Sequence, residues 1–147
     1  MMNKLYPCLW FDGNAKEAAD YYCAVFKNSR ITADTPMVVN FEINGQKFMG
    51  LNGGPMFHFN EAVSYVVECA DQEEIDYYWN SLTSDGGEES RCGWLKDKFG
   101  LSWQIVPGEL GKLMSKGDPV KGNAMMQALM KMGKLDIAAL KAAYEAG

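Results

Sequence analysis

The chain has 147 residues, the size of one domain or of two small similar halves. Hydrophobic residues make up 48% and charged residues 22%, which excludes a disordered chain. The net charge of −5 disfavours nucleic acid and anionic membrane surfaces as partners, because both need a basic face. No segment is long enough to span a membrane, and the N-terminus lacks a signal-peptide pattern. We expect a cytoplasmic protein with reduced thiols.

The first half predicts a strand, a helix and then further strands. Residues 5–11 form an apolar run, which predicts a strand. Asn14 and Glu17 have capping-box spacing, and a helical apolar stripe continues to Phe26. A weaker strand is expected at 30–34, and Asn44-Gly45 is the preferred turn for a hairpin between strands at 37–43 and 47–51.

The second half repeats this order. A valine-rich strand is expected at 62–70, and Asp71 with Glu74 has capping-box spacing for the next helix. Strands at 92–96 and 101–106 follow, with a bend at Phe99-Gly100. The Asp-Tyr-Tyr at 20–22 recurs at 76–78 (76 − 20 = 56), and Gly45 matches Gly100 (100 − 45 = 55). Two similar halves are therefore expected.

The segment after Pro107 has a different composition. Asp118-Pro119 is a typical helix start, and Asp136 opens a final helix. The methionines between these points are typical of core or dimer packing, although they could also form an adaptable binding surface. Because this tail has few apolar residues, we expect it to pack on the body or on a partner subunit.

Several motifs resemble one known family. They are LWFDGNAKEA at 9–18, GQKF at 45–48, CGWLKDKFGLSWQIVP at 92–107 and MGKLDI at 132–137. They are similar to the PhnB-like branch, often labelled 3-demethylubiquinone-9 3-methyltransferase, of the glyoxalase/bleomycin-resistance/extradiol-dioxygenase (vicinal oxygen chelate) superfamily.

The resemblance implies an α+β fold of two βαβββ modules, each curling its sheet around a cavity. One domain over 1–147 is expected, with modules at about 1–55 and 60–107 and a helical tail at 108–147. A homodimer is expected because such modules bury open sheet edges against a partner.

The resemblance also implies a divalent metal held by one residue from each of four strands. The corresponding residues here are Pro7, Met49, Ser64 (or its neighbour Val63) and Gln104. Only Gln104 could plausibly serve as a ligand, and one amide oxygen cannot hold a hard divalent ion. The sequence therefore predicts no metal and no other cofactor.

The methyltransferase label is not supported by the residues. A nucleotide-type methyl donor generally binds a glycine-rich turn between a strand and a helix, but the first such turn, at 12–14, has one glycine. We expect the label to be nominal.

Strand alternation puts Ser102 and Gln104 on one face and Trp103 on the other. The resemblance implies that Gln104 faces the cavity, which puts Trp103 under a helix and predicts a mostly apolar pocket with a few polar groups. Such a pocket suits an uncharged aromatic or amphipathic molecule, although the same side chains could simply fill a small barrel. The expected pocket residues are Leu9, Phe11, Met49, Ser64, Glu68, Trp94, Ser102 and Gln104.

Two further side chains have a reactive and an ordinary interpretation. His58 could act as a general base, but it more simply belongs to a loop between the halves. Cys92 follows Arg91, which could lower its pKa, but a free cysteine usually behaves as a small apolar residue. No catalytic residue is assigned.

Three functions remain open. The first is a metal-free protein that binds a small apolar or aromatic molecule. The second is a superfamily metalloenzyme with an atypical ligand set of Glu42, His58, Glu68 and Gln104. The third is a degenerate scaffold that acts through its surface.

Overall fold

A computed structural model of the chain describes residues 4–147. The chain divides into two compact units, which we call unit 1 (up to residue 59) and unit 2 (residues 60–147). Each unit contains one four-stranded sheet, and the strand orders β1-β4-β3-β2 and β5-β8-β7-β6 are equivalent. The duplication expected from the two sequence shifts is therefore confirmed in the topology.

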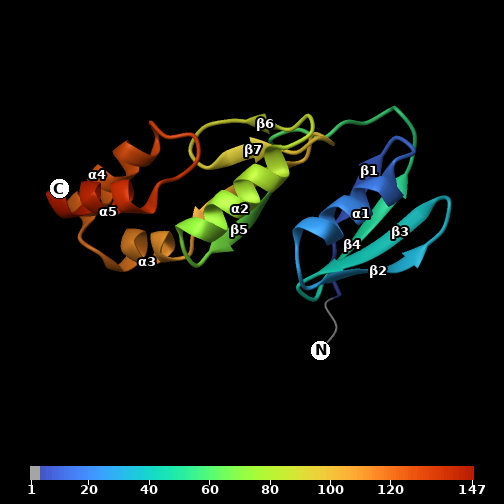
Figure 1. The fold of residues 1–147 in the computed structure, drawn as a ribbon, viewed down its shortest axis with the longest axis horizontal. Coiled ribbons are helices and arrows are strands. Elements are labelled where there is room, and N and C mark those ends of the chain that lie inside the picture. Colours follow the sequence, from blue (N-terminus) through green and yellow to red (C-terminus); the bar gives the residue numbers. More distant parts are fainter. Residues whose placement is uncertain (1–3) are drawn as a thin grey trace. The chain divides into compact units, whose positions relative to one another are not determined.

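Unit 1 is a mixed sheet with one helix (Figure 1). The β1 strand is parallel to β4, and the β2-β3-β4 segment is an antiparallel meander. Side chains from α1 and the sheet form the core, in which Phe41 stacks on Phe48 with ring centroids 5.3 Å apart and on Tyr22 at 6.0 Å. The elements are β1 (Cys8–Phe11), α1 (Ala15–Val25), β2 (Ser29–Asp34), β3 (Val38–Ile43) and β4 (Gln46–Asn52).

The β3–β4 hairpin has the turn predicted from Asn44-Gly45. These residues have φ angles of 50° and 83°, the left-handed pair that a tight hairpin requires. Asparagine and glycine adopt such angles most readily. This turn sets the register in which Phe41 lies opposite Phe48.

Unit 2 has the same arrangement, followed by the helical tail. The β5 strand is parallel to β8, which is antiparallel to β7. As predicted, Trp103 and Ile105 are buried (4% and 0% exposed), and α2 packs against their strand. The elements are β5 (Ser64–Cys69), α2 (Gln72–Thr83), β6 (Glu88–Glu89), β7 (Trp94–Lys96), β8 (Ser102–Pro107), α3 (Glu109–Lys116), α4 (Pro119–Leu129) and α5 (Ile137–Ala146).

The bend between β7 and β8 is built around a buried carboxylate. Asp97 is 3% exposed. Its Oδ1 accepts hydrogen bonds from the backbone N–H groups of Phe99 (2.9 Å) and Leu101 (3.1 Å). Its Oδ2 accepts one from the indole Nε1 of Trp103 (2.8 Å). One side chain therefore links the turn to the core of unit 2.

The two predicted capping boxes differ in outcome. The Asp71 carboxylate accepts from the Glu74 backbone N–H (2.9 Å), as expected at the start of α2. The Asn14 side chain makes no capping hydrogen bond, so that prediction is wrong. Instead, Asn52 Oδ1 accepts from the Ala15 N–H (2.9 Å), because β4 ends beside the start of α1 and brings an amide to the same donor.

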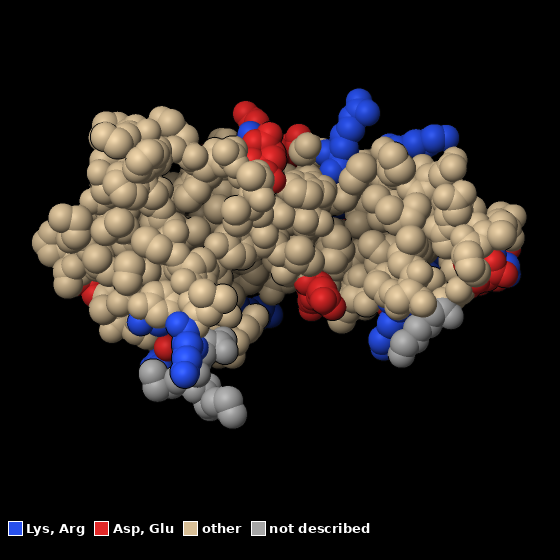
Figure 2. Space-filling view, turned by 180° about the vertical axis from the view of Figure 1, so that it is seen from behind, with Lys and Arg blue, Asp and Glu red and all other residues tan. Residues whose placement is uncertain are grey.

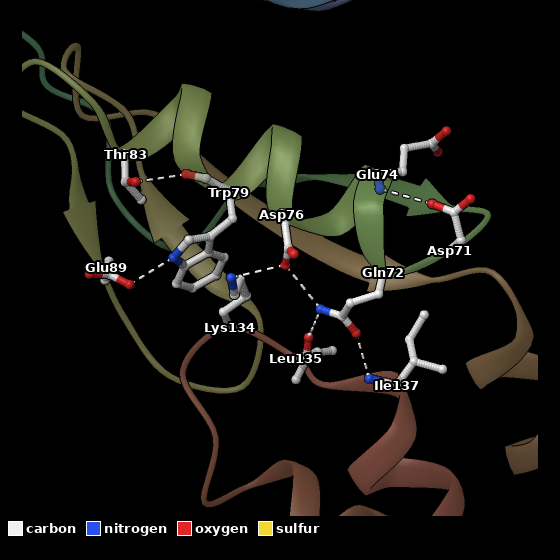
Figure 3. A network of polar contacts seen from close by, with 10 residues as sticks. All are labelled: Asp71, Gln72, Glu74, Asp76, Trp79, Thr83, Glu89, Lys134, Leu135 and Ile137. Carbon is white, nitrogen blue, oxygen red and sulfur yellow. Dashed lines mark hydrogen bonds and ion pairs between the residues drawn. The ribbon is translucent and has the colours of Figure 1, made fainter.

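The tail packs on the body of unit 2, one of the two expected outcomes. The Gln72 side chain of α2 accepts from the Ile137 N–H (2.8 Å) and donates to the Leu135 carbonyl (3.0 Å), as Figure 3 shows. Lys134 forms an ion pair with Asp76 at 2.9 Å. Asp118 and Asp136 cap α4 and α5 as predicted, whereas α3 is an additional helix.

Two observations bear on the environment of the chain. Over residues 4–147 no helix is long and apolar enough to cross a membrane. The four cysteines, Cys8, Cys23, Cys69 and Cys92, are all free thiols.

Candidate functional site

The open face of the unit 2 sheet, opposite α2, carries four of the predicted pocket residues. Ser64 pairs with Ser102 in the β5–β8 register, and Trp94 pairs with Gln104 across β7 and β8. Paired residues point to the same side of a sheet, so these four side chains share one face. The Gln104 Nε2 donates to the Ser64 Oγ (2.9 Å), which fixes the orientation of the amide.

A cavity of about 190 Å³ opens on this face, and we call it the sheet cavity. Trp94 supplies an aromatic ring, and Ser102 supplies a hydroxyl from β8. Loop and edge residues complete the wall. The lining residues are Glu61, Glu88, Glu89, Ser90, Trp94, Leu95, Lys96 and Ser102.

The Ser102 hydroxyl is the unusual group of this cavity. The residue is 1% exposed, and its Oγ has no hydrogen-bond partner. Leaving a buried polar group unpaired costs about 1–3 kcal/mol, and most buried hydroxyls therefore have a partner. A molecule in the cavity that bonded to Ser102 would remove that cost.

The charges around the sheet cavity are mostly negative and partly neutralised. Lys96 Nζ lies 3.1 Å from Glu61 Oε1, and this hydrogen bond lowers the pKa of Glu61. The Glu89 carboxylate accepts from the Trp79 indole (2.7 Å), which holds it against the end of α2 (Figure 3). Glu88 is exposed. Glu88 pairs with Lys96 in the β6–β7 register, so two carboxylates, Glu61 and Glu88, lie beside one ammonium group and oppose an anionic ligand.

The other predicted pocket residues lie elsewhere. Glu68 shares the open face but is exposed and does not line the sheet cavity. Met49 lies on the open face of the unit 1 sheet, because its neighbours Phe48 and Gly50 are buried on the side of α1. It is therefore in a different unit from Ser102 and Gln104.

Leu9 and Phe11 differ from expectation. They are 5% and 3% exposed and belong to the face that packs on α1, whereas Cys8 and Trp10 occupy the open face. Gly50 permits this close packing: a Cβ there would lie 3.2 Å from the Ala15 Cβ and 3.5 Å from the Phe11 ring. Strand alternation correctly puts Leu9 and Phe11 on one face and Cys8 and Trp10 on the other, but it does not say which face the helix covers.

The residues do not fit the divalent metal that the fold family implies. In the described part of the chain, no three His, Cys, Asp or Glu side chains gather closely enough to hold a metal ion. Ser64 and Gln104 stand in unit 2 at two of the positions where the resemblance implies metal ligands. Their side chains are hydrogen-bonded to each other. Hard divalent ions prefer several carboxylate oxygens.

The alternative ligand set is divided between the two units. Glu42 and His58 belong to unit 1, and Glu68 and Gln104 to unit 2. Glu42 lies 3.6 Å from Arg30 in an ion pair, and His58 is exposed in a loop. The Cys92 thiol donates to the Met130 carbonyl (3.7 Å), a structural contact with the tail.

Sequence analysis missed several residues of the sheet cavity. Glu61, Glu89 and Lys96 come from a loop and two short strands whose proximity depends on the fold. Asp97, which holds the β7–β8 bend, had a local signal, because it directly precedes the predicted bend at Phe99-Gly100. At such places an aspartate side chain often accepts from the N–H two residues later, as it does here from Phe99. On the face shown in Figure 2, uncharged residues cover most of the surface, and Lys, Arg, Asp and Glu form small separate groups.

Comparisons with known proteins agree on one family. Residues 3–106 match the model of the 3-demethylubiquinone-9 3-methyltransferase family. A structure of the PhnB protein of Bacillus cereus, described under the same methyltransferase name, is 30% identical with a TM-score of 0.64, over 71% of this chain and 99% of that one. No curated protein matches the chain.

More distant structures share the fold. The fosfomycin resistance protein FosX of Listeria monocytogenes, solved with Mn(II) and sulfate, has 15% identity and a TM-score of 0.58, over 80% of this chain and 100% of that one. A glyoxalase-related enzyme from Fulvimarina pelagi has 14% identity and a TM-score of 0.53, over 71% and 87%. The fold is that of the vicinal oxygen chelate superfamily, and the chain belongs to its PhnB-like 3-demethylubiquinone-9 3-methyltransferase family.

Proposed function

We propose that the chain binds a small, uncharged aromatic or amphipathic molecule in the sheet cavity, without a metal. The observation that carries this proposal is the buried Ser102 hydroxyl, which has no partner at the wall of a cavity that also contains Trp94. An aromatic ring could stack on the Trp94 indole while a hydroxyl or carbonyl group bonded to Ser102.

The charge of the cavity supports an uncharged ligand. Glu61 and Glu88 lie beside one cation, Lys96, which already pairs with Glu61. An anionic ligand would meet repulsion from the remaining carboxylate, Glu88. Selectivity against anions is therefore part of the proposal.

We also propose that the methyltransferase name is nominal for this chain. The turn between β1 and α1 contains one glycine, Gly13, and each sheet combines one parallel pair with antiparallel strands. A nucleotide-type methyl donor generally uses a glycine-rich turn in a doubly wound parallel sheet.

A cytoplasmic homodimer is the proposed form of the protein. The free cysteines suit a reducing compartment. The exposed apolar side chains of Met114, Val120 and Met130 in the tail, together with the outer edge of β2, are surfaces that a second copy could cover. Sedimentation equilibrium measures the mass of the particle, and a monomer at micromolar concentration would contradict this part of the proposal.

The substitution Ser102→Ala tests the proposed site through two effects of opposite direction. Because the hydroxyl is buried without a partner, its removal is expected to stabilise the free protein by about 1 kcal/mol. The same change is expected to weaken binding of 2-naphthol about five- to tenfold, because one hydrogen bond of roughly 1 kcal/mol is lost. Chemical denaturation and titration calorimetry measure the two quantities.

Two controls accompany this test. The substitution Ser115→Ala removes an exposed hydroxyl from α3 and is expected to change neither quantity. The anion 2-naphthoate has the same rings as 2-naphthol and is expected to bind at least tenfold more weakly. Equal binding of 2-naphthol by wild type and Ser102→Ala would exclude the proposed site.

A further inference from the structure

A second and larger cavity lies between the body of unit 2 and its helical tail. Its volume is about 360 Å³, and we call it the tail cavity. The buried part of its wall is formed by Cys69, Pro107, Met125 and Leu140, from β5, β8, α4 and α5 respectively. Leu110 and Leu113 of α3 complete the apolar wall. The volume lies within the range of about 300–1,000 Å³ that is usual for small-molecule sites.

The tail that closes this cavity lies beyond the part of the chain that the family model matches. The family model ends at residue 106, whereas α3, α4 and α5 all follow it. The Bacillus cereus structure aligns over 99% of its own length but only 71% of this chain, which leaves 29% (100 − 71) of this chain unmatched.

The polar groups around the tail cavity are already occupied. The Gln72 side chain bonds to Leu135 and Ile137. At the rim, Lys141 Nζ lies 3.4 Å from Glu109 Oε2, so the cation is paired. Burial, followed by the charges of Glu74 and Asp71, raises the pKa of the Cys69 thiol to about 12, and the thiol therefore stays neutral at pH 7.

We propose that the tail cavity is a second binding site, for an uncharged and mainly apolar molecule. The apolar wall offers contact area, the rim cation Lys141 is already paired with Glu109, and the Asp71 carboxylate opposes an anionic head group. Recognition therefore depends on shape and apolar contact. This site is separate from the sheet cavity, because no residue lines both.

A neutral fluorescent probe, N-phenyl-1-naphthylamine, tests the proposal on the full chain. Ala138 of α5 is exposed and lines the cavity, so Ala138→Trp is expected to fill its mouth with little effect on folding. The neighbouring Ala139 is also exposed but does not line the cavity, which makes Ala139→Trp the matched control. Wild type and Ala139→Trp are expected to bind one more probe per chain than Ala138→Trp, because the sheet cavity is the same in all three and could accept the same uncharged probe.

Probe binding by a variant of the sheet cavity distinguishes the two sites. Ser102→Ala changes the sheet cavity alone and is expected to keep the binding that Ala138→Trp loses. Lack of saturable binding by wild type, or equal binding by the two tryptophan variants, would overturn the proposal. Circular dichroism and thermal melting of each variant confirm that weaker binding does not come from unfolding.

Discussion

Replacing Asp97 by alanine is expected to lower the free energy of unfolding by about 3–5 kcal/mol. The carboxylate is 3% exposed and accepts three hydrogen bonds, from the N–H groups of Phe99 and Leu101 and from the Trp103 indole. Without it, three donors at a buried bend lose their acceptor. Hydrogen bonds to a charged group contribute about 1.5–3 kcal/mol each, and their effects are not fully additive.

Chemical denaturation followed by circular dichroism measures this loss. The control is Asp20→Ala, because Asp20 is exposed on α1 and forms an ion pair with Lys16, one helical turn earlier, at 2.9 Å. Its removal is expected to cost no more than about 0.5 kcal/mol. A loss below 1 kcal/mol for Asp97→Ala would show that the bend does not depend on its carboxylate. Because β7 and β8 carry Trp94 and Ser102, Asp97→Ala is also expected to weaken binding in the sheet cavity.

Replacing Gln72 by alanine is expected to loosen the tail by about 2 kcal/mol, because two hydrogen bonds to the tail, of roughly 1 kcal/mol each, are lost. The side chain accepts from Ile137 and donates to Leu135 and to Asp76, the last at 3.1 Å (Figure 3). Lys134 and, second, Gln72 lower the pKa of Asp76 below its ordinary value of 3.8. The pKa of Asp76 is therefore expected to rise in the variant.

Hydrogen exchange detected by mass spectrometry measures the effect on the tail. Amides of residues 135–146 are expected to exchange at least tenfold faster in Gln72→Ala, while those of α1 in unit 1 remain unchanged. The control is Gln127→Ala, an exposed position on α4 that is expected to leave exchange unaltered. Unchanged exchange in Gln72→Ala would mean that the apolar cluster around Leu135 and Leu140 alone holds the tail.

Local sequence signals predicted much of the fold. The Asn44-Gly45 turn and the Asp71 cap depend on residues within a few positions of each other, and both have the predicted form. Alternation correctly placed Ser102 and Gln104 on the face of the sheet opposite to that of Trp103, because side-chain direction in a strand has a period of two. The family motifs predicted the βαβββ order of both halves.

Features that depend on distant parts of the chain were not predictable in this way. The amide that meets the start of α1 comes from Asn52 rather than Asn14, because β4 returns beside that helix. Leu9 and Phe11 face α1 because the helix covers their side of the sheet, which alternation cannot specify. The two-residue strand β6 contains only glutamates and has no apolar pattern. Its Glu89 nevertheless reaches the Trp79 indole.

Native mass spectrometry of the full chain with 2-naphthol tests the central proposal most directly. With the tail cavity filled by Ala138→Trp, the account predicts one bound 2-naphthol per chain, no bound divalent metal, and the same ligand mass after treatment with a chelator. Ser102→Ala is expected to show a smaller bound fraction at the same concentration. A tightly held divalent metal in each chain, with ligand binding lost after chelation, would contradict the account and favour a metalloenzyme.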